Sequence, residues 1–269
     1  MKLGLDNGLS AYQVAAIRIV ASGLVLLPNA IRFFKLIPKN KLALVILSGT
    51  LGSLLPAFLF CLAEEGVDSS LAGALNSLTP IFVIINGALF FQTKTALNKV
   101  IGILLAFTGS FLLLLSNRHF GENSQLTYVL FIIIATFMYG FNVNMVAKHL
   151  KNIPSIHIAS VSLSMNAIPA LIILITTGFF KLPLQNPDLL IGIGASALLG
   201  ISSTAIATIL FYVLLKRASP IFASMVTYGI PFVALGWGWI YHESIGLPQI
   251  GSLLVILLGV FVANWPSRK

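Results

Sequence analysis

The chain has 269 residues, of which 58% are hydrophobic and only 9% are charged. A soluble domain usually carries about 25% charged residues, and the mean hydropathy here is +1.00. These values exclude soluble, secreted, fibrous and disordered proteins, and the single cysteine, Cys61, excludes an internal disulfide. The net charge of +9 has to be interpreted from where the basic residues fall along the chain.

Apolar runs of bilayer length recur along the whole chain. A membrane-spanning helix needs about 20 mostly apolar residues, and these runs lack the two-residue alternation of barrel strands. Divided at polar residues, Pro and Gly, they predict nine spans, at residues 11–31, 42–62, 70–91, 97–116, 126–147, 156–178, 189–214, 220–241 and 246–265. The intervals leave no room for a soluble domain. We therefore expect an all-α polytopic membrane protein embedded in the lipid bilayer.

The basic residues gather on one side of these spans, and cytoplasmic loops of membrane proteins collect Lys and Arg. One face receives twelve of the sixteen: Arg32, Lys35, Lys39, Lys41, Lys94, Lys99, Lys148, Lys151, Lys216, Arg217, Arg268 and Lys269. The other face receives Lys2, Arg118 and Lys181, and also all seven acids: Asp6, Glu64, Glu65, Asp68, Glu122, Asp188 and Glu243. The first face and the C-terminus are therefore expected to be cytoplasmic, with the chain in the cytoplasmic (inner) membrane. Since the basic excess reports topology, no nucleic-acid partner is expected.

The two halves of the chain repeat one pattern. A shift of 151 residues places the second, third and fourth spans on the seventh, eighth and ninth, and it aligns Ala72 with Ala223 and Pro80 with Pro231. The first span matches the sixth, whereas the fifth has no counterpart. A repeated unit of five helices must invert, because five is odd, and inverted repeats are typical of secondary transporters. We therefore expect two transporter halves, residues 1–119 with four helices and residues 120–269 with five.

The missing counterpart of the fifth span predicts a tenth helix upstream of Met1. Residues 1–3 would then be the end of that helix farthest from the cytoplasm, and both termini would be cytoplasmic. The alternative is a protein of nine helices with an external N-terminus.

Five segments resemble a known family: Ala16-Ile17-Arg18, residues 72–82, residues 102–109, residues 223–231 and Tyr241-His242-Glu243. In these the chain is similar to the EamA family of the drug/metabolite transporter superfamily, over its whole length except the family's first helix. The resemblance implies two inverted five-helix halves and export or exchange of small metabolites, such as amino acids, without ATP. Glu243 matches an acid that family members often have in each half, but Gln92 stands at the corresponding place in the first half.

Polar side chains inside a bilayer are costly unless they face a cavity or another helix, so each is a candidate site residue. In the third span Asn76 and Thr79 share one helix face, and Thr227 lies on the matching face of the eighth span. Pro80 and Pro231 remove backbone donors beside them, and Pro-interrupted helices at corresponding positions indicate a transporter's binding site. The alternative is that Asn and Thr only join helices by hydrogen bonds.

Further candidates for a substrate-binding cavity come from other spans: Tyr139, Asn142, Asn166, Tyr228, Trp237 and Arg18. The amides and Tyr139 could complete a neutral hydrogen-bonding cavity, and Tyr228 and Trp237 could stack on a substrate or pack in the core. Arg18 is the one formal charge well inside a span. It could bind a substrate carboxylate, or it could hold helix-end carbonyls or extend to the membrane surface.

Small residues at spacings that favour close helix packing occur in three spans. Gly192, Ser196, Gly200, Thr204 and Thr208 follow each other at four-residue steps in the seventh span. This ladder predicts close helix packing first and flexibility of a half-bundle second. The glycines of the fourth and ninth spans could support a homodimer or pack within one chain: Gly102, Gly109, Gly251 and Gly259.

The sequence lacks the motifs of most energy-coupled or enzymatic membrane proteins. No Gly-rich loop with Lys-Ser/Thr indicates ATP binding, no His pair or Ser/His/Asp set indicates an enzyme or a metal site, and no carboxylate lies deep in a span. We therefore expect no enzyme, cofactor or metal. Two hypotheses remain: a secondary carrier for small neutral or zwitterionic solutes, working by alternating access, and a non-transporting membrane scaffold or assembly partner with the same fold.

The charge distribution makes a direct prediction of topology. A reporter fused after Lys269 is expected to be cytoplasmic, and one fused after Asp188 is expected to be external, because the basic loops lie with the first and the acidic loops with the second. Paired alkaline phosphatase and green fluorescent protein fusions measure this. An external Lys269 fusion would overturn the orientation.

Overall fold

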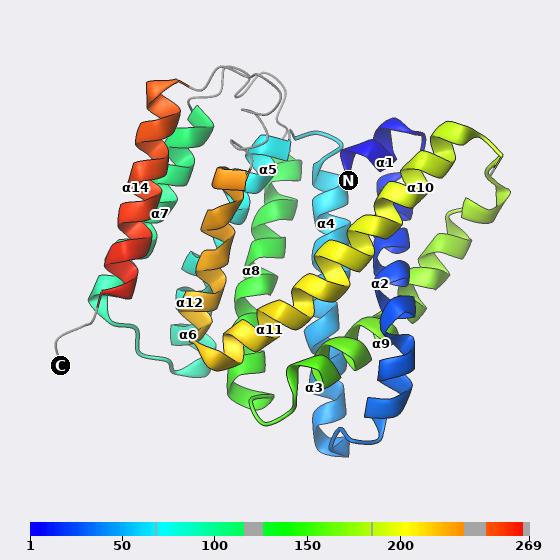
Figure 1. Cartoon of the computed structure of the whole chain (residues 1–269), viewed down its shortest axis with the longest axis horizontal. Coiled ribbons are helices and arrows are strands. Elements are labelled where there is room, and N and C mark those ends of the chain that lie inside the picture. The colour runs from blue at the N-terminus through cyan, green and yellow to red at the C-terminus, as the bar shows by residue number, and fades with distance from the viewer. Residues whose placement is uncertain (68, 116–125, 184, 234–245, 266–269) are drawn as a thin grey trace.

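The computed structural model describes residues 1–67, 69–115, 126–183, 185–233 and 246–265, and these contain helices and no strand. The first half of the chain holds α1 (Lys2–Asp6), α2 (Ala11–Phe34), α3 (Lys39–Gly49), the π-helix η1 (Thr50–Leu54), α4 (Leu55–Ala63), α5 (Ser69–Asn76), α6 (Thr79–Phe91) and α7 (Leu97–Leu115). The second holds α8 (Leu126–His149), α9 (Ser155–Thr176), the 3-10 helix η2 (Phe179–Lys181), α10 (Pro187–Leu199), the π-helix η3 (Gly200–Ile206), α11 (Ala207–Arg217), α12 (Pro220–Ser224), the 3-10 helix η4 (Met225–Gly229) and α14 (Leu247–Asn264). Figure 1 shows them as one helical bundle.

Seven helical segments are long and apolar enough to cross a membrane: Ala11–Phe34, Lys39–Ala63, Leu71–Phe91, Leu126–His149, Ser155–Thr176, Pro187–Arg217 and Leu247–Asn264. Two shorter apolar helices, Leu97–Leu113 and Pro220–Val233, lie in the predicted fourth and eighth spans. Residues 234–241 of the eighth span are outside the described residues. The chain is thus a polytopic helical membrane protein, and nine crossings stay a prediction.

Four of the predicted spans are not regular helices throughout. The second and seventh contain π-helical segments, the third divides between Asn76, where α5 ends, and Thr79, where α6 begins, and the eighth passes from α12 into the 3-10 helix η4. Pro80 stands in the first turn of α6, where a missing N–H removes no hydrogen bond. A proline farther inside a continuous helix would cost a hydrogen bond, so the break falls just before Pro80.

A capping box fixes the start of α2. The Ser10 N–H donates to Oε1 of Gln13 over 3.0 Å, and the Gln13 N–H donates to Oγ of Ser10 over 3.3 Å. The same Gln13 side chain donates through Nε2 to the Thr177 carbonyl, 3.2 Å away beyond the end of α9. One residue thus both begins α2 and ties it to α9.

Farther along α2, this helix and α9 pack closely through small residues. A Cβ on Gly23 would stand 2.9 Å from the backbone oxygen of Leu163 and 2.5 Å from the Cβ of Ala167. The Ser164 hydroxyl donates to the Gly23 carbonyl over 2.9 Å. Because only glycine fits here, the two helices can approach until the Ser164 side chain of α9 reaches the backbone of α2.

The pair α7 and α14 uses the same device at the opposite edge of the bundle (Figure 1). A Cβ on Gly259 would collide with the backbone nitrogen of Ala106 and stand 2.6 Å from the Gly102 oxygen, and Gly109 meets the Ile256 backbone. Gly251 has no neighbouring atom within 4 Å. Gly102, Gly109 and Gly259 are thus occupied by packing within the chain, and a homodimer stays a prediction.

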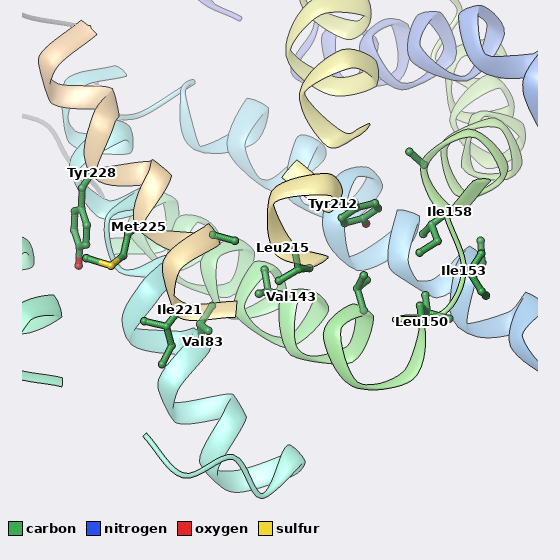
Figure 2. Packing of buried hydrophobic residues seen from close by; sticks show 14 of the residues in the cluster. Val83, Val143, Leu150, Ile153, Ile158, Tyr212, Leu215, Ile221, Met225 and Tyr228 are labelled. Carbon is green, nitrogen blue, oxygen red and sulfur yellow. The ribbon is translucent and has the colours of Figure 1, made fainter. Parts of the chain in front are cut away.

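Buried apolar side chains join the helices between these two pairs. Val83 of α6, Val143 of α8 and Ile158 of α9 are at most 2% exposed, and they belong to one cluster with Leu215 of α11 and Ile221 of α12 (Figure 2). This cluster lies in the part of the bundle where both halves of the chain meet, so it fixes the helices that carry the candidate site.

The α7 and α14 contact predicts a stability difference between two glycines of one helix. Gly259→Ala is expected to destabilise the protein by about 1–3 kcal/mol, because the added methyl meets backbone atoms that cannot move aside. Gly251→Ala adds the same methyl where there is space and gains helix propensity of up to about 1 kcal/mol. The thermal unfolding midpoint of the purified proteins in detergent measures both, and equal midpoints would contradict the packing.

Candidate functional site

A cavity of about 350 Å³ lies between elements of the two halves. Its lining combines hydroxyl, amide and guanidinium groups with apolar side chains: Arg18, Gly52, Ser53, Asn76, Thr79, Tyr139, Asn142, Val143, Ser203, Thr204, Ala207, Thr208, Phe211, Tyr212, Ser224, Val226, Thr227 and Ile230. Ligand cavities usually have about 300–1,000 Å³, so this one suits a small solute. Six of the nine predicted site residues are among the lining: Arg18, Asn76, Thr79, Tyr139, Asn142 and Thr227.

Two interrupted helices contribute to the lining at equivalent positions. In the first half Asn76 and Thr79 stand on either side of the break between α5 and α6, and in the second half Thr227 lies in the 3-10 segment η4. A shift of 151 residues places Asn76 on Thr227. The Thr79 hydroxyl donates to Oδ1 of Asn76 over 3.2 Å, and the Thr227 hydroxyl donates to the Ser224 carbonyl over 2.9 Å. Polar groups therefore concentrate where the backbone leaves regular helix geometry.

Two π-helical segments contribute in the same paired way. Thr50–Leu54 falls on residues 201–205 of Gly200–Ile206 after the 151-residue shift, and each segment lines the cavity, with Gly52 and Ser53 in one and Ser203 and Thr204 in the other. Each π-helix adds a residue to a turn and so turns a side chain out of the regular helical register. Such bulges occur often at functional sites.

The π-helix η1 carries one glycine, Gly52, against which side chains of the second half pack. A Cβ on Gly52 would collide with Nδ2 of Asn142 and stand 3.4 Å from the hydroxyl of Tyr212. Asn142 is 3% exposed, and its Nδ2 donates to the Tyr212 hydroxyl over 3.3 Å. Its Oδ1 is buried with no hydrogen-bond partner, which costs about 1–3 kcal/mol where no solute meets it.

Two hydrogen bonds hold Arg18 in the cavity. Its Nε donates to the Thr204 hydroxyl over 2.7 Å, and Nη1 donates to the weakly accepting sulfur of Met1 over 3.5 Å. A Cβ on Gly200 would collide with the Arg18 carbonyl oxygen, so glycine lets η3 approach α2 closely enough for the Thr204 contact. Within the described part of the chain no carboxylate lies within 4 Å of the guanidinium.

The positive charge of Arg18 affects the pKa of the Glu64 carboxyl. Glu64 follows α4, outside the membrane spans, and its Oε2 is buried without a hydrogen-bond partner. Burial raises the pKa of the Glu64 carboxyl, while the positive charges of the N-terminus, Arg18 and Lys2 oppose that rise. The carboxyl is thus held between desolvation, which favours its protonated form, and nearby cations, which favour its charge.

Two predicted site residues that the structure describes, Asn166 and Tyr228, do not line the cavity. Asn166 is 2% exposed and joins helices: its Nδ2 donates to the carbonyls of Ile46 and Ser162, and its Oδ1 accepts from Thr50 over 2.8 Å. Tyr228 is 1% exposed and donates to the Ile103 carbonyl over 3.0 Å. Trp237 lies outside the described residues. Asn166 therefore joins helices in this structure, and Tyr228 packs in the core, which is the alternative considered for it.

The lining also contains residues that the sequence analysis did not single out for it. Thr204 and Thr208 belong to the four-residue ladder, which was assigned to packing. The next step of the same ladder is Tyr212, whose hydroxyl meets Asn142. One further four-residue step of the ladder, from Thr208, therefore predicts Tyr212 as a lining residue. The packing role holds for Gly192 and Gly200, which contact the Gly4 region and α2, so one stripe serves both purposes.

A family profile and a solved structure match nearly the whole chain, and two curated relatives match about three quarters of it. The profile of the EamA-like transporter family matches residues 1–115 and 126–265. An uncharacterized transporter of Archaeoglobus fulgidus is 27% identical over 203 residues, covering 75% of this chain and 70% of the relative. Protein PagO of Salmonella typhimurium is 24% identical over 213 residues, covering 77% and 68%. A solved crystal structure with 16% identity covers 98% of this chain and 91% of its own with a TM-score of 0.72, which shows a shared fold.

The site predicts that two asparagines differ in their effect on stability. Asn166→Ala removes three interhelical or backbone hydrogen bonds and should cost about 1–2 kcal/mol, whereas Asn76→Ala, with one 3.2 Å contact to a neighbouring residue, should cost less than half of that. Thermal unfolding in detergent compares them. A larger loss for Asn76→Ala would contradict the division into helix-joining and cavity-lining groups.

Proposed function

Because the chain belongs to the EamA-like transporter family, we propose that this membrane transporter is a secondary carrier. It exports or exchanges small metabolites, amino-acid-like or otherwise neutral or zwitterionic, by alternating access. The observation that carries the proposal is the polar cavity whose lining comes from broken helices at equivalent positions of both halves, Asn76 and Thr79 in one and Thr227 in the other.

The inverted repeat supplies the mechanism. Residues 1–119 and 120–269 form two halves that rock about the solute site, and the site is open to one side at a time. Three features support this division. Each of two helices packs on its own counterpart in the other half, α2 on α9 and α7 on α14. The two π-helices also coincide after the 151-residue shift. The basic loops orient the carrier in the cytoplasmic membrane with the C-terminus inside.

Hydrogen bonds between the solute and the cavity lining replace those that the solute made with water. Thr79, Asn142 and Thr227 offer hydroxyl and amide groups at the depth of the membrane, where an unsatisfied polar solute would be costly. Among the residues that the structure describes, no carboxylate lines the cavity. The site therefore suits facilitated export or exchange rather than proton pumping.

A second candidate function is a non-transporting scaffold with the same fold. A scaffold needs helix packing but no polar cavity, so the two functions make different demands on cavity-lining side chains. Substitutions that fill the cavity without disturbing helix packing therefore discriminate between them.

Asn76→Leu and Thr227→Leu are expected to lower solute release at least tenfold while membrane abundance stays within twofold of wild type, because each puts an apolar group where a polar one lines the cavity. Thr108→Leu is the matched control, since Thr108 is exposed on α7 and bonds only its own helix. Metabolite profiling of medium and cells, with immunoblots of membranes, measures both quantities. Unchanged release, or loss of the protein itself, would favour the scaffold.

A further inference from the structure

Tyr212 lies at the end of the cavity nearest the basic end of α11. Among the residues of η3 and α11 that line the cavity, it comes last in the chain. From Tyr212 to Arg217, where α11 ends, the helix rises by roughly 8 Å. Arg217 belongs to the basic loops, which are expected to be cytoplasmic. In the proposed orientation Tyr212 therefore belongs to the cytoplasmic floor of the cavity.

Beyond this floor the bundle is filled with apolar side chains. Leu215 on α11, Val146 on α8 and Val45 on α3 each lie about one turn nearer the expected cytoplasmic side, and each is at most 3% exposed. They belong to one cluster with the ring of Tyr212 (Figure 2 labels Tyr212 and Leu215). A polar solute is costly to place in such a layer, so the floor has to open before a solute passes.

The elements α8, α3 and η1 meet at the Tyr212 hydroxyl. Nδ2 of Asn142, on α8, donates to it over 3.3 Å, and the Ser48 side chain, on α3, interacts with it from the first half. The Ser48 hydroxyl itself donates to the Val45 carbonyl over 2.7 Å, so its oxygen can accept the hydrogen of the tyrosine. A Cβ on Gly52 would stand 3.4 Å from the Tyr212 hydroxyl, and glycine thus lets η1 close over it.

These contacts differ from the hydrogen bonds that fix neighbouring helices. Asn166, for example, donates from α9 to the Ile46 carbonyl of α3 over 3.0 Å, a bond to backbone that lies away from the cavity lining. The partners of the Tyr212 hydroxyl are instead side chains, those of Asn142 and Ser48, at the edge of the cavity. Water in the cavity can replace such partners, so the floor can open without leaving a buried polar group unpaired.

We propose that the Tyr212 hydroxyl is the latch of a cytoplasmic gate. Bonded to Asn142 and held against Ser48 and Gly52, it keeps the floor closed, and its release lets the apolar layer beyond it separate. The inference rests on the proposed carrier function and names a residue that governs passage toward the cytoplasm. Tyr212 is a positioning residue here, because it acts on the closed conformation whichever solute is carried.

A cysteine in the cavity reports whether the floor is closed. The parent chain carries Cys61→Ser and Thr227→Cys, and a small charged methanethiosulfonate reagent is applied to intact cells and to inside-out vesicles. The ratio of the cytoplasmic to the external modification rate is measured within each protein. Tyr212→Phe is expected to raise this ratio at least fivefold, because it removes the hydroxyl and keeps the ring. Tyr128→Phe, which removes a tyrosine hydroxyl of α8 outside the cavity lining, should leave it within twofold.

Ser48→Ala tests the same contact from the first half of the chain. It is expected to raise the ratio in the same direction as Tyr212→Phe. The double variant should stay within twofold of the larger single effect, because one contact can be lost only once. Ser48→Ala carries the test if Tyr212→Phe does not fold.

The parent chain separates failure of the gate from failure of the carrier. Modification from both sides, with a ratio that Tyr212→Phe leaves unchanged, would overturn the gate and leave the carrier standing. If Ser48→Ala has no effect, or if the two effects multiply in the double variant, the contact between Tyr212 and Ser48 is overturned as the latch. Modification of the parent chain from one side only, or from neither, would contradict alternating access and the gate with it.

Discussion

The bilayer offers no water to polar groups, and this one constraint orders the whole structure. Every buried amide, hydroxyl or charge must find a partner inside the chain or face a cavity. Asn144, Asn166 and Ser164 find carbonyls on neighbouring helices. Asn142 and Arg18 satisfy only part of their hydrogen-bonding capacity, and both lie at the cavity. Unpaired buried atoms also occur away from the cavity, among them Oδ1 of Asn86 and Oγ of Ser160.

Close packing makes this arrangement possible. Helices in a bilayer gain little from the hydrophobic effect on association, so they rely on contact between small residues. Gly23 lets α2 meet α9, Gly259 lets α14 meet α7, and Gly200 lets η3 reach Arg18. With both edges of the bundle closed by such contacts, the interrupted helices between them can hold polar groups around a space.

Much of the fold was predictable from the sequence, because hydrophobic runs of bilayer length have one structural solution in lipid. The candidate cavity was predictable where a proline marks an interrupted helix, as for Asn76 and Thr227. The π-helices were not, since one extra residue in a turn leaves the hydrophobic pattern unchanged. Nor could Asn166 be separated from Asn142: both are polar residues within apolar helices, and only the neighbouring backbone decides whether a carbonyl or the cavity meets the amide.

In the proposed mechanism one site opens to each side of the membrane in turn. Its most direct test places a cysteine at Thr227, in a chain with Cys61→Ser, and applies a small charged methanethiosulfonate reagent to intact cells and to inside-out vesicles. Only a hydrated thiolate reacts, and Met225→Cys, at a buried position, is the control. Alternating access predicts modification of Thr227→Cys from both sides. Modification from one side only, or from neither, would contradict it.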